Sequence, residues 1–117
     1  MKKFILVASV FGFISQAVMA GEGELIPRSM YEKASYYLVS VKPDGKFMQS
    51  LHSRVSAMSR GYSVTRIDCE NRRFQDLGYG EESQSNIKMY DKVQWAEVVI
   101  GSSKSDLVTF VCSKQRK

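Results

Sequence analysis

Few residues of this chain have the types and spacing that chemistry needs. A hydrolase needs a nucleophile and an oriented base, but the single histidine is His52 and there is no G-x-S-x-G motif. Gly101-Ser102-Ser103-Lys104 is not a Ser/Lys nucleophile motif, because the spacing is not S-x-x-K and no partner motif follows. A helix N-cap followed by a solvated lysine explains these residues. The sequence therefore predicts no catalytic residues and a protein that is not an enzyme.

Metal and cofactor sites also lack their usual residues. A metal site needs clustered His, Cys or carboxylate groups, and Glu81-Glu82 is more typical of a solvated loop. Gly78 and Gly80 lack the strand-to-helix context and the following lysine of a phosphate-binding loop. We therefore expect neither a metal ion nor a cofactor.

The N-terminus has the pattern of a secretory signal peptide over residues 1–20. A basic start precedes an apolar run over residues 4–14, and Ala20 is the small residue at the cleavage position. The alternative is a buried core helix over 4–18. The run is too short to span a bilayer, and no second apolar segment or lipid-anchor cysteine follows it. We expect cleavage between Ala20 and Gly21 and an exported protein, periplasmic or at the cell surface, without a transmembrane segment.

Cys69 and Cys112 are the only cysteines. An exported chain of this size buries only about two-thirds of its unfolded surface, so a disulfide between them is the predicted extra constraint. Two free thiols or a metal pair are the alternatives. The processed chain has 17 − 2 = 15 basic residues and 12 acidic residues, a net charge of +3. This balance is too mildly basic to predict a nucleic-acid partner.

Runs of β-branched and aromatic residues, separated by turn residues, predict an antiparallel meander. Pro43-Asp44-Gly45 has the residues of a turn, and Glu70-Asn71 marks a second bend. A helix over 64–77 competes with two of these strands, but the density of Tyr, Val, Thr and Ile favours strands. The predicted extended segments are residues 36–41, 47–58, 62–69, 72–79, 87–90 and 93–100.

The only predicted helix covers residues 104–112, after Gly101 breaks the preceding run and Ser102 or Ser103 caps the helix. Its apolar stripe consists of Leu107, Val108, Val111 and Cys112. The predicted fold class is α+β, a small antiparallel meander sheet with this C-terminal helix packed on one face and one disulfide. The predicted organisation is a signal peptide at 1–20, a flexible or weakly ordered segment at 21–34, one α+β domain at 35–113 and a basic tail at 114–117.

Strand alternation predicts that one face of the sheet stays open. The assignment assumes that Cys69 faces the helix and that Leu51 and Val55 point to the core, which places His52 on the open face. Tyr and Arg are enriched in interface cores, so this face is a candidate site for an acidic partner. The alternative is an ordinary solvated face, and a one-residue slip would reverse every assignment. The predicted partner-binding residues are Arg54, Arg66, Arg73, Tyr62 and Tyr79.

Trp95 has two interpretations. It either anchors a partner, as aromatic residues at binding hot spots do, or packs beneath the C-terminal helix. The second interpretation is the simpler one for a single tryptophan in a small domain.

A pattern of cysteines, arginines and a tryptophan spans residues 35–113. Its residues are Ile67-Asp68-Cys69-Glu70-Asn71-Arg72-Arg73-Phe74, Trp95, Gly101-Ser102-Ser103, Leu107-Val108 and Val111-Cys112. The pattern resembles the surface-adhesin protein E family of bacterial exported proteins. The resemblance implies a small antiparallel sheet with a disulfide-tied C-terminal helix, and an adhesin-like role toward host matrix proteins. It includes no catalytic signature.

These features predict an exported, non-enzymatic binding module, adhesin-like, with a protein partner. The alternative is a small periplasmic inhibitor or immunity-type protein that blocks an enzyme. Such a protein needs a projecting loop, and residues 78–86 are the only candidate.

Overall fold

The computed structural model describes residues 23–115. The predicted signal peptide, its cleavage site at Ala20 and Gly21, and the end of the basic tail lie outside the described residues. The elements, in chain order, are β1 Glu24–Leu25, β2 Ser35–Asp44, β3 Phe47–Val55, β4 Arg60–Asp68, β5 Arg73–Glu81, the 3-10 turn η2 Gln84–Asn86, β6 Lys88–Met89, β7 Ala96–Glu97 and α2 Ser103–Gln115.

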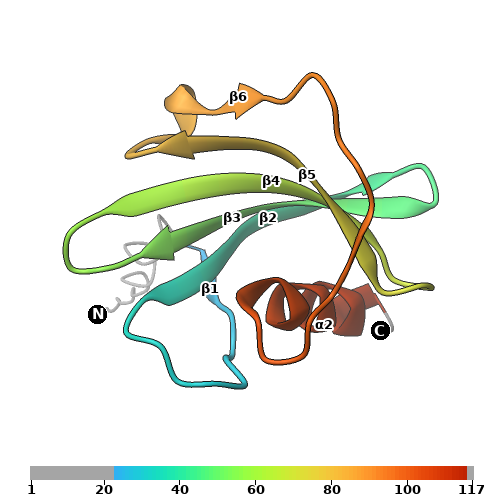
Figure 1. Ribbon diagram of the computed structural model, residues 1–117, viewed down its shortest axis with the longest axis horizontal. Coiled ribbons are helices and arrows are strands. Elements are labelled where there is room, and N and C mark those ends of the chain that lie inside the picture. The colour runs from blue at the N-terminus through green and yellow to red at the C-terminus, as the bar shows by residue number, and fades with distance from the viewer. Residues whose placement is uncertain (1–22, 116–117) are drawn as a thin grey trace, which may run out of the picture.

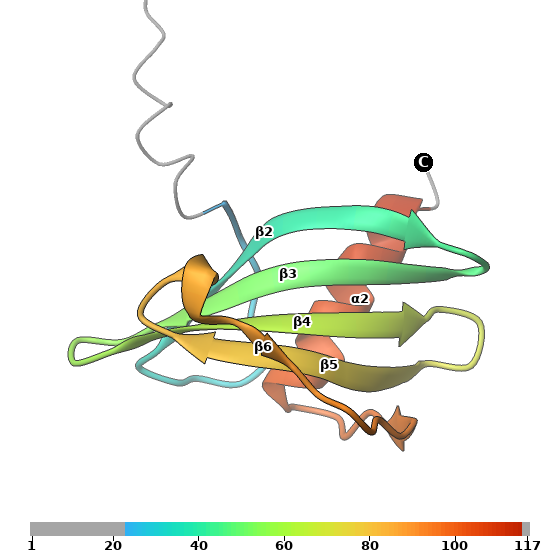
Figure 2. The same ribbon diagram turned by 90° about the horizontal axis from the view of Figure 1, so that it is seen from above.

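The strands form one antiparallel sheet whose order follows the chain, β1-β2-β3-β4-β5-β6, and β7 also pairs with β5. Short connections between consecutive strands favour such a meander. Helix α2 crosses one face of β2 to β5, whereas η2 and β6 lie toward the other side (Figure 1, Figure 2). The predicted α+β fold is confirmed.

The β2–β3 hairpin turns later than Pro43-Asp44-Gly45 suggested. Asp44 already pairs with Phe47, and Gly45 has a φ of 63°, which glycine adopts without steric cost. Pro43 lies inside β2 instead. Its missing N–H is tolerated because β1 pairs with β2 only at Tyr37 and Leu38, so this stretch of β2 is a sheet edge.

Residues 60–68 and 73–81 form strands β4 and β5, as predicted, and not the competing helix. β5 contains a bulge: Thr65 pairs with Asp76 and Val64 with Gly78, which leaves Leu77 as an extra residue. A bulge of this kind changes the side to which the following residues project. The strand predicted over residues 72–79 did not include this bulge.

Residues 23–34 belong to the domain, and the prediction of a weakly ordered segment is wrong for them. β1 pairs with β2, and the Ile26 N–H donates to the Tyr36 carbonyl at 2.8 Å. Ile26 and Ala34 are both buried in the core. Isolated buried positions show no periodicity, so the sequence pattern could not reveal them.

Helix α2 is longer than predicted at both ends. Ser102 is its N-cap, because the Ser102 hydroxyl accepts the Ser105 N–H at 3.1 Å. Asp106 does not form a capping box with a serine at the helix start. Its carboxylate instead accepts hydrogen bonds from the Ser29 N–H and from Arg28 Nε. The predicted apolar stripe is buried against the sheet: Leu107, Val108, Val111 and Cys112.

Cys69 and Cys112 form the predicted disulfide, which joins the β4–β5 turn to α2. This bond is consistent with an oxidising compartment such as the periplasm or the outside of a cell. Among residues 23–115, no helix has the length and apolar character needed to cross a bilayer.

Candidate functional site

The strand register divides the sheet into a covered face, under α2, and an open face. Residues directly opposite each other in an antiparallel pair project to the same side. Met48 and Phe74 both pair with Ile67, and all three pack in the core with the helix. The alternating residues therefore lie on the open face: Phe47, Arg66, Asp68, Arg73 and Gln75.

An aromatic and basic cluster occupies the open face beside the β4–β5 turn. The ring centroids of Phe47 and Trp95 are 4.9 Å apart, with an interplanar angle of 59°. Arg73 Cζ lies 4.8 Å from the Trp95 centroid, and Lys46 Nζ lies 5.5 Å from the Phe47 centroid. Both distances are within cation–π range. We call these four residues, together with Arg66, the open-face cluster.

Trp95 does not pack beneath α2, so the simpler sequence interpretation is wrong. β7 pairs Glu97 with Arg73 and Ala96 with Phe74. Alternation then places Trp95 on the open face with Arg73, whereas Val98 turns into the core. The sequence missed this arrangement because it depends on the non-local pairing of a two-residue strand.

Arg66 and Arg73 lie on the open face as predicted, and each has a carboxylate partner. Arg66 Nε donates to Asp44 at 2.8 Å and its Nη1 donates to Gln75 at 2.8 Å, and Arg73 Nη2 donates to Asp68 at 2.9 Å. These bonds cross between strands and hold the two guanidinium groups in place. They also neutralise part of the positive charge that the sequence predicted on this face.

Asp68 organises the turn that carries Cys69. Its Oδ1 accepts the Asn71 N–H at 3.2 Å, and its Oδ2 accepts the Asn71 side-chain amide at 3.0 Å. The hydrogen bond from the Asn71 side chain, followed by that from Arg73, lowers the pKa of Asp68 to about 2. Asp68 is therefore ionised at neutral pH although it is buried. The turn is longer than the predicted two-residue bend.

The middle of the open face is hollowed between β2, β4 and the residue before β6. The hollow has a volume of about 240 Å³. This volume is below the usual range for small-molecule sites and suits a single side chain of a partner. Its lining includes Ser40, Lys42, Gln49, Leu51, Val64 and Ile87.

Arg54 lies on the helix side of the sheet, so its assignment to the open face is wrong. It pairs with the core residue Tyr36, its Nε donates to the Tyr36 hydroxyl at 3.1 Å, and its Nη2 donates to Glu32 at 3.3 Å. The prediction assumed that the aliphatic residues Leu51 and Val55 point to the core. The helix-side series of β3 is instead Met48, Ser50, His52 and Arg54.

The two predicted tyrosines do not join the open-face cluster. The β5 bulge turns Tyr79 to the helix side, where its hydroxyl lies 2.3 Å from the position that a Cβ on Gly61 would take. Tyr62 projects to the open side, opposite Gly80, but is buried. The backbone of Asn86 passes 2.6 Å from a Cβ position on Gly80. This end of the open face is therefore covered by the chain itself.

Residues 78–86, the predicted projecting loop, take another form. They remain in β5 as far as Glu81 and then turn back through η2 over the sheet. The structure of these residues therefore gives no support to the alternative function, an inhibitor that inserts this loop into an enzyme.

His52 is a core side chain on the covered face. Burial, with a smaller effect from the positive charge of Lys104, lowers the pKa of His52 to about 4. The imidazole is therefore neutral at physiological pH. Within residues 23–115, no group of three His, Cys, Asp or Glu side chains is placed to hold a metal ion.

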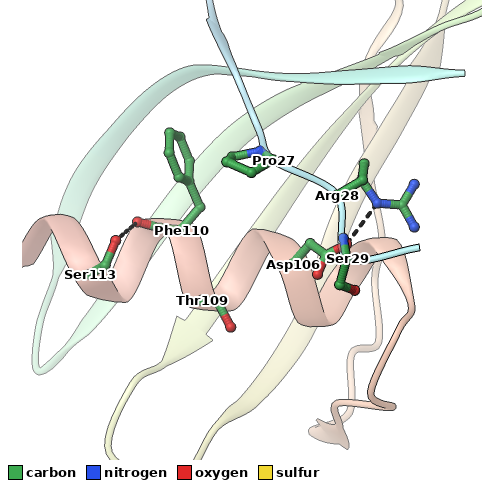
Figure 3. Close-up of a pocket in the computed structure, with 7 residues that line it drawn as sticks. All are labelled: Pro27, Arg28, Ser29, Asp106, Thr109, Phe110 and Ser113. Carbon is green, nitrogen blue, oxygen red and sulfur yellow. Dashed lines mark hydrogen bonds and ion pairs between the residues drawn. The ribbon is translucent and has the colours of Figure 1, made fainter. Parts of the chain in front are cut away.

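A second hollow, of about 350 Å³, lies between the N-terminal segment and the exposed side of α2. Pro27 and Phe110 lie near each other at one end, while the ion pair between Arg28 and Asp106 closes the other (Figure 3). The Ser113 hydroxyl donates to the Phe110 carbonyl at 2.8 Å (Figure 3). Because Arg28 and Asp106 are paired with each other, the charged groups that line this hollow are not free for chemistry.

Comparisons with protein-family models, with curated proteins and with solved structures found no match for the chain. The resemblance to the surface-adhesin protein E family therefore gains no support from them.

Proposed function

We propose that this protein is an exported, non-enzymatic binding module that holds a protein partner on the open face of its sheet. The observation that carries the proposal is the half-buried pair Phe47 and Trp95, flanked by Arg73 and Lys46 on a face without a covering helix. Tryptophan and arginine contribute most often to binding hot spots. A partly exposed aromatic pair leaves apolar area for a partner to cover.

An acidic protein surface fits this face best. Arg66 and Arg73 are held by carboxylates, whereas Lys42 and Lys46 are exposed. Lys42 adds positive charge beside the hollow, and Lys46 adds it beside Phe47. Attraction between opposite charges speeds association and weakens as salt increases. A host matrix protein is one partner of this kind, and only the family resemblance suggests it.

The location that we propose is the periplasm or the cell surface. The disulfide supports an oxidising compartment, and the signal-peptide pattern supports export. Protease treatment of intact cells separates the two locations: cleavage indicates the surface, whereas protection with release by osmotic shock indicates the periplasm. Retention inside spheroplasts would contradict export.

Affinity capture with the immobilised processed protein tests the binding function, using an envelope extract and a panel of purified matrix proteins. Trp95→Ala, and separately Lys42→Glu with Lys46→Glu, should reduce the affinity for the captured partner by about tenfold or more. The matched control is Lys33→Glu with Lys88→Glu, an equal change of charge at exposed positions off the cluster. Equal capture by parent, test and control proteins would contradict the proposal.

A further inference from the structure

Two loops meet beside the start of α2, on the side of the molecule away from the open face. Residues 28–33 precede β2 and residues 98–102 precede α2, and the loops lie next to each other at the bottom of Figure 1 and again in Figure 2. Arg28 Nη2 donates to the Gly101 carbonyl at 3.3 Å. Met30 Cγ is 3.1 Å from the position that a Cβ on Gly101 would take.

These loops expose large apolar side chains at one end of the protein. The exposed fractions are 60% for Met30, 88% for Tyr31, 69% for Val99 and 93% for Ile100. We call these four residues the apolar tip. Single exposed hydrophobic residues are ordinary, but neighbouring ones from two fixed loops mark an interaction surface.

The loops are held together by a hub of ion pairs around Arg28. Arg28 Nε donates to Asp106 at 2.7 Å, and its Nη1 donates to Glu32. The hydrogen bond from Arg28 lowers the pKa of Glu32, so this carboxylate is charged but neutralised by its partner. Lys33, beside it, is exposed. The carboxylates of Glu32 and Asp106 are therefore paired, whereas Glu97, two residues before Val99, is exposed. The tip itself presents apolar groups with one exposed lysine beside them.

We propose that the apolar tip inserts into the interfacial region of an anionic phospholipid bilayer. Side chains that project from the surface with few protein contacts can be buried in the lipid of a bilayer without a complementary protein pocket. Tyr31 is of a residue type enriched at membrane interfaces. Lys33 and the net positive charge of the chain complement anionic headgroups. Contact through the tip would leave the open-face cluster directed away from the membrane.

The test is co-sedimentation of the processed protein with vesicles of equimolar phosphatidylglycerol and phosphatidylethanolamine. The processed form is needed because the apolar run at 4–14 would itself bind lipid; intact mass confirms its N-terminus. We expect binding that falls by about tenfold or more in Val99→Asp with Ile100→Asp, because the substitutions replace two apolar side chains that would be buried in lipid by charged ones. Vesicles of pure phosphatidylcholine should bind less of the parent protein.

Met58→Asp is the matched control, because Met58 is 91% exposed but stands at the β3–β4 turn. It should bind vesicles like the parent, and circular dichroism should show all variants folded. Failure of the folded parent to bind anionic vesicles would overturn the proposal. A different result would be a parent protein that does not bind vesicles but associates with itself, and whose self-association is abolished by Val99→Asp with Ile100→Asp. That result would overturn the proposal in favour of a contact between two copies of the chain.

Discussion

The two faces of the sheet use the same strands for different purposes. On the covered face, Ile67 meets Leu107 and Val108, and none of the three is more than 1% exposed. On the open face, Phe47 and Trp95 stay partly exposed among ion-paired arginines. The covered face therefore provides stability through dry packing, whereas the open face keeps side chains available at the surface.

β4 shows the difference within one strand. Ile67 points to the helix, while its neighbours Arg66 and Asp68 point to the open side and form ion pairs across to other strands. Substitutions on the two sides should therefore have different readouts. The covered face should control unfolding, and the open face should control binding.

Removal of the disulfide should have the largest effect on stability. Cys69→Ser with Cys112→Ser opens a loop closed across a sequence separation of 43 residues. The chain-entropy relation gives a loss of about 4 kcal/mol in the free energy of unfolding. Urea denaturation of parent and variant measures the loss. A loss below about 1 kcal/mol would mean that the disulfide is not what fixes the helix on the sheet.

Leu107→Ala should lower the free energy of unfolding by about 3 kcal/mol, within the range of roughly 2–5 for buried leucines. Leu107 is 1% exposed in the covered core. Ser113→Ala is the control on the same helix, because Ser113 is exposed and its hydroxyl donates to the Phe110 carbonyl of the helix itself. A loss equal to that of the control would place the helix stripe in solvent.

Acid should weaken the covered face first. The buried His52 has its pKa lowered from 6.5 to about 4, so the unfolded chain binds a proton between these values and the folded chain does not. Stability should fall as the pH falls through this window, by roughly 3 kcal/mol. NMR titration of the His52 ring should give a midpoint near 4, and a midpoint at the ordinary value would contradict its burial.

The open face should respond at lower pH and less strongly. The pKa of Asp68 is lowered from 3.8 to about 2, so the stability due to its ionised form is present above this window and is lost as the pH falls through it. The loss should be at most about 2 kcal/mol. Asp68→Asn should flatten the dependence of stability on pH below 3.8, and an unchanged slope would show that its bonds to Asn71 and Arg73 do not matter.

Sequence reasoning succeeded where the signals are local. The four strand runs between residues 36 and 79, the stripe of Leu107, Val108 and Val111, and the pairing of Cys69 with Cys112 each follow from short patterns or from elimination, and the structure confirms them. The predicted run at 93–100 is wrong in length, because only the two residues of β7 pair with the sheet. The meander follows from the strand order because its connections are short.

Sequence reasoning failed where a face depends on non-local packing. β3 turns Ser50 and His52 to the helix and Leu51 to the open side, against the hydrophobic rule that the prediction used. The β5 bulge then moved Tyr79, and the pairing of β7 moved Trp95. A one-residue change of register reverses a face, so these errors removed two of the five predicted binding residues from the open side.

The difference between the faces is tested most directly by one capture assay on three folded proteins: the parent, Lys42→Glu with Lys46→Glu, and Leu107→Ala. We expect the lysine variant to unfold within about 0.5 kcal/mol of the parent, since both positions are exposed, but to lose most of the captured partner. Leu107→Ala should be much less stable yet capture as much partner per folded molecule. Retained capture by the lysine variant, or loss of capture by folded Leu107→Ala, would contradict a binding role for the open face.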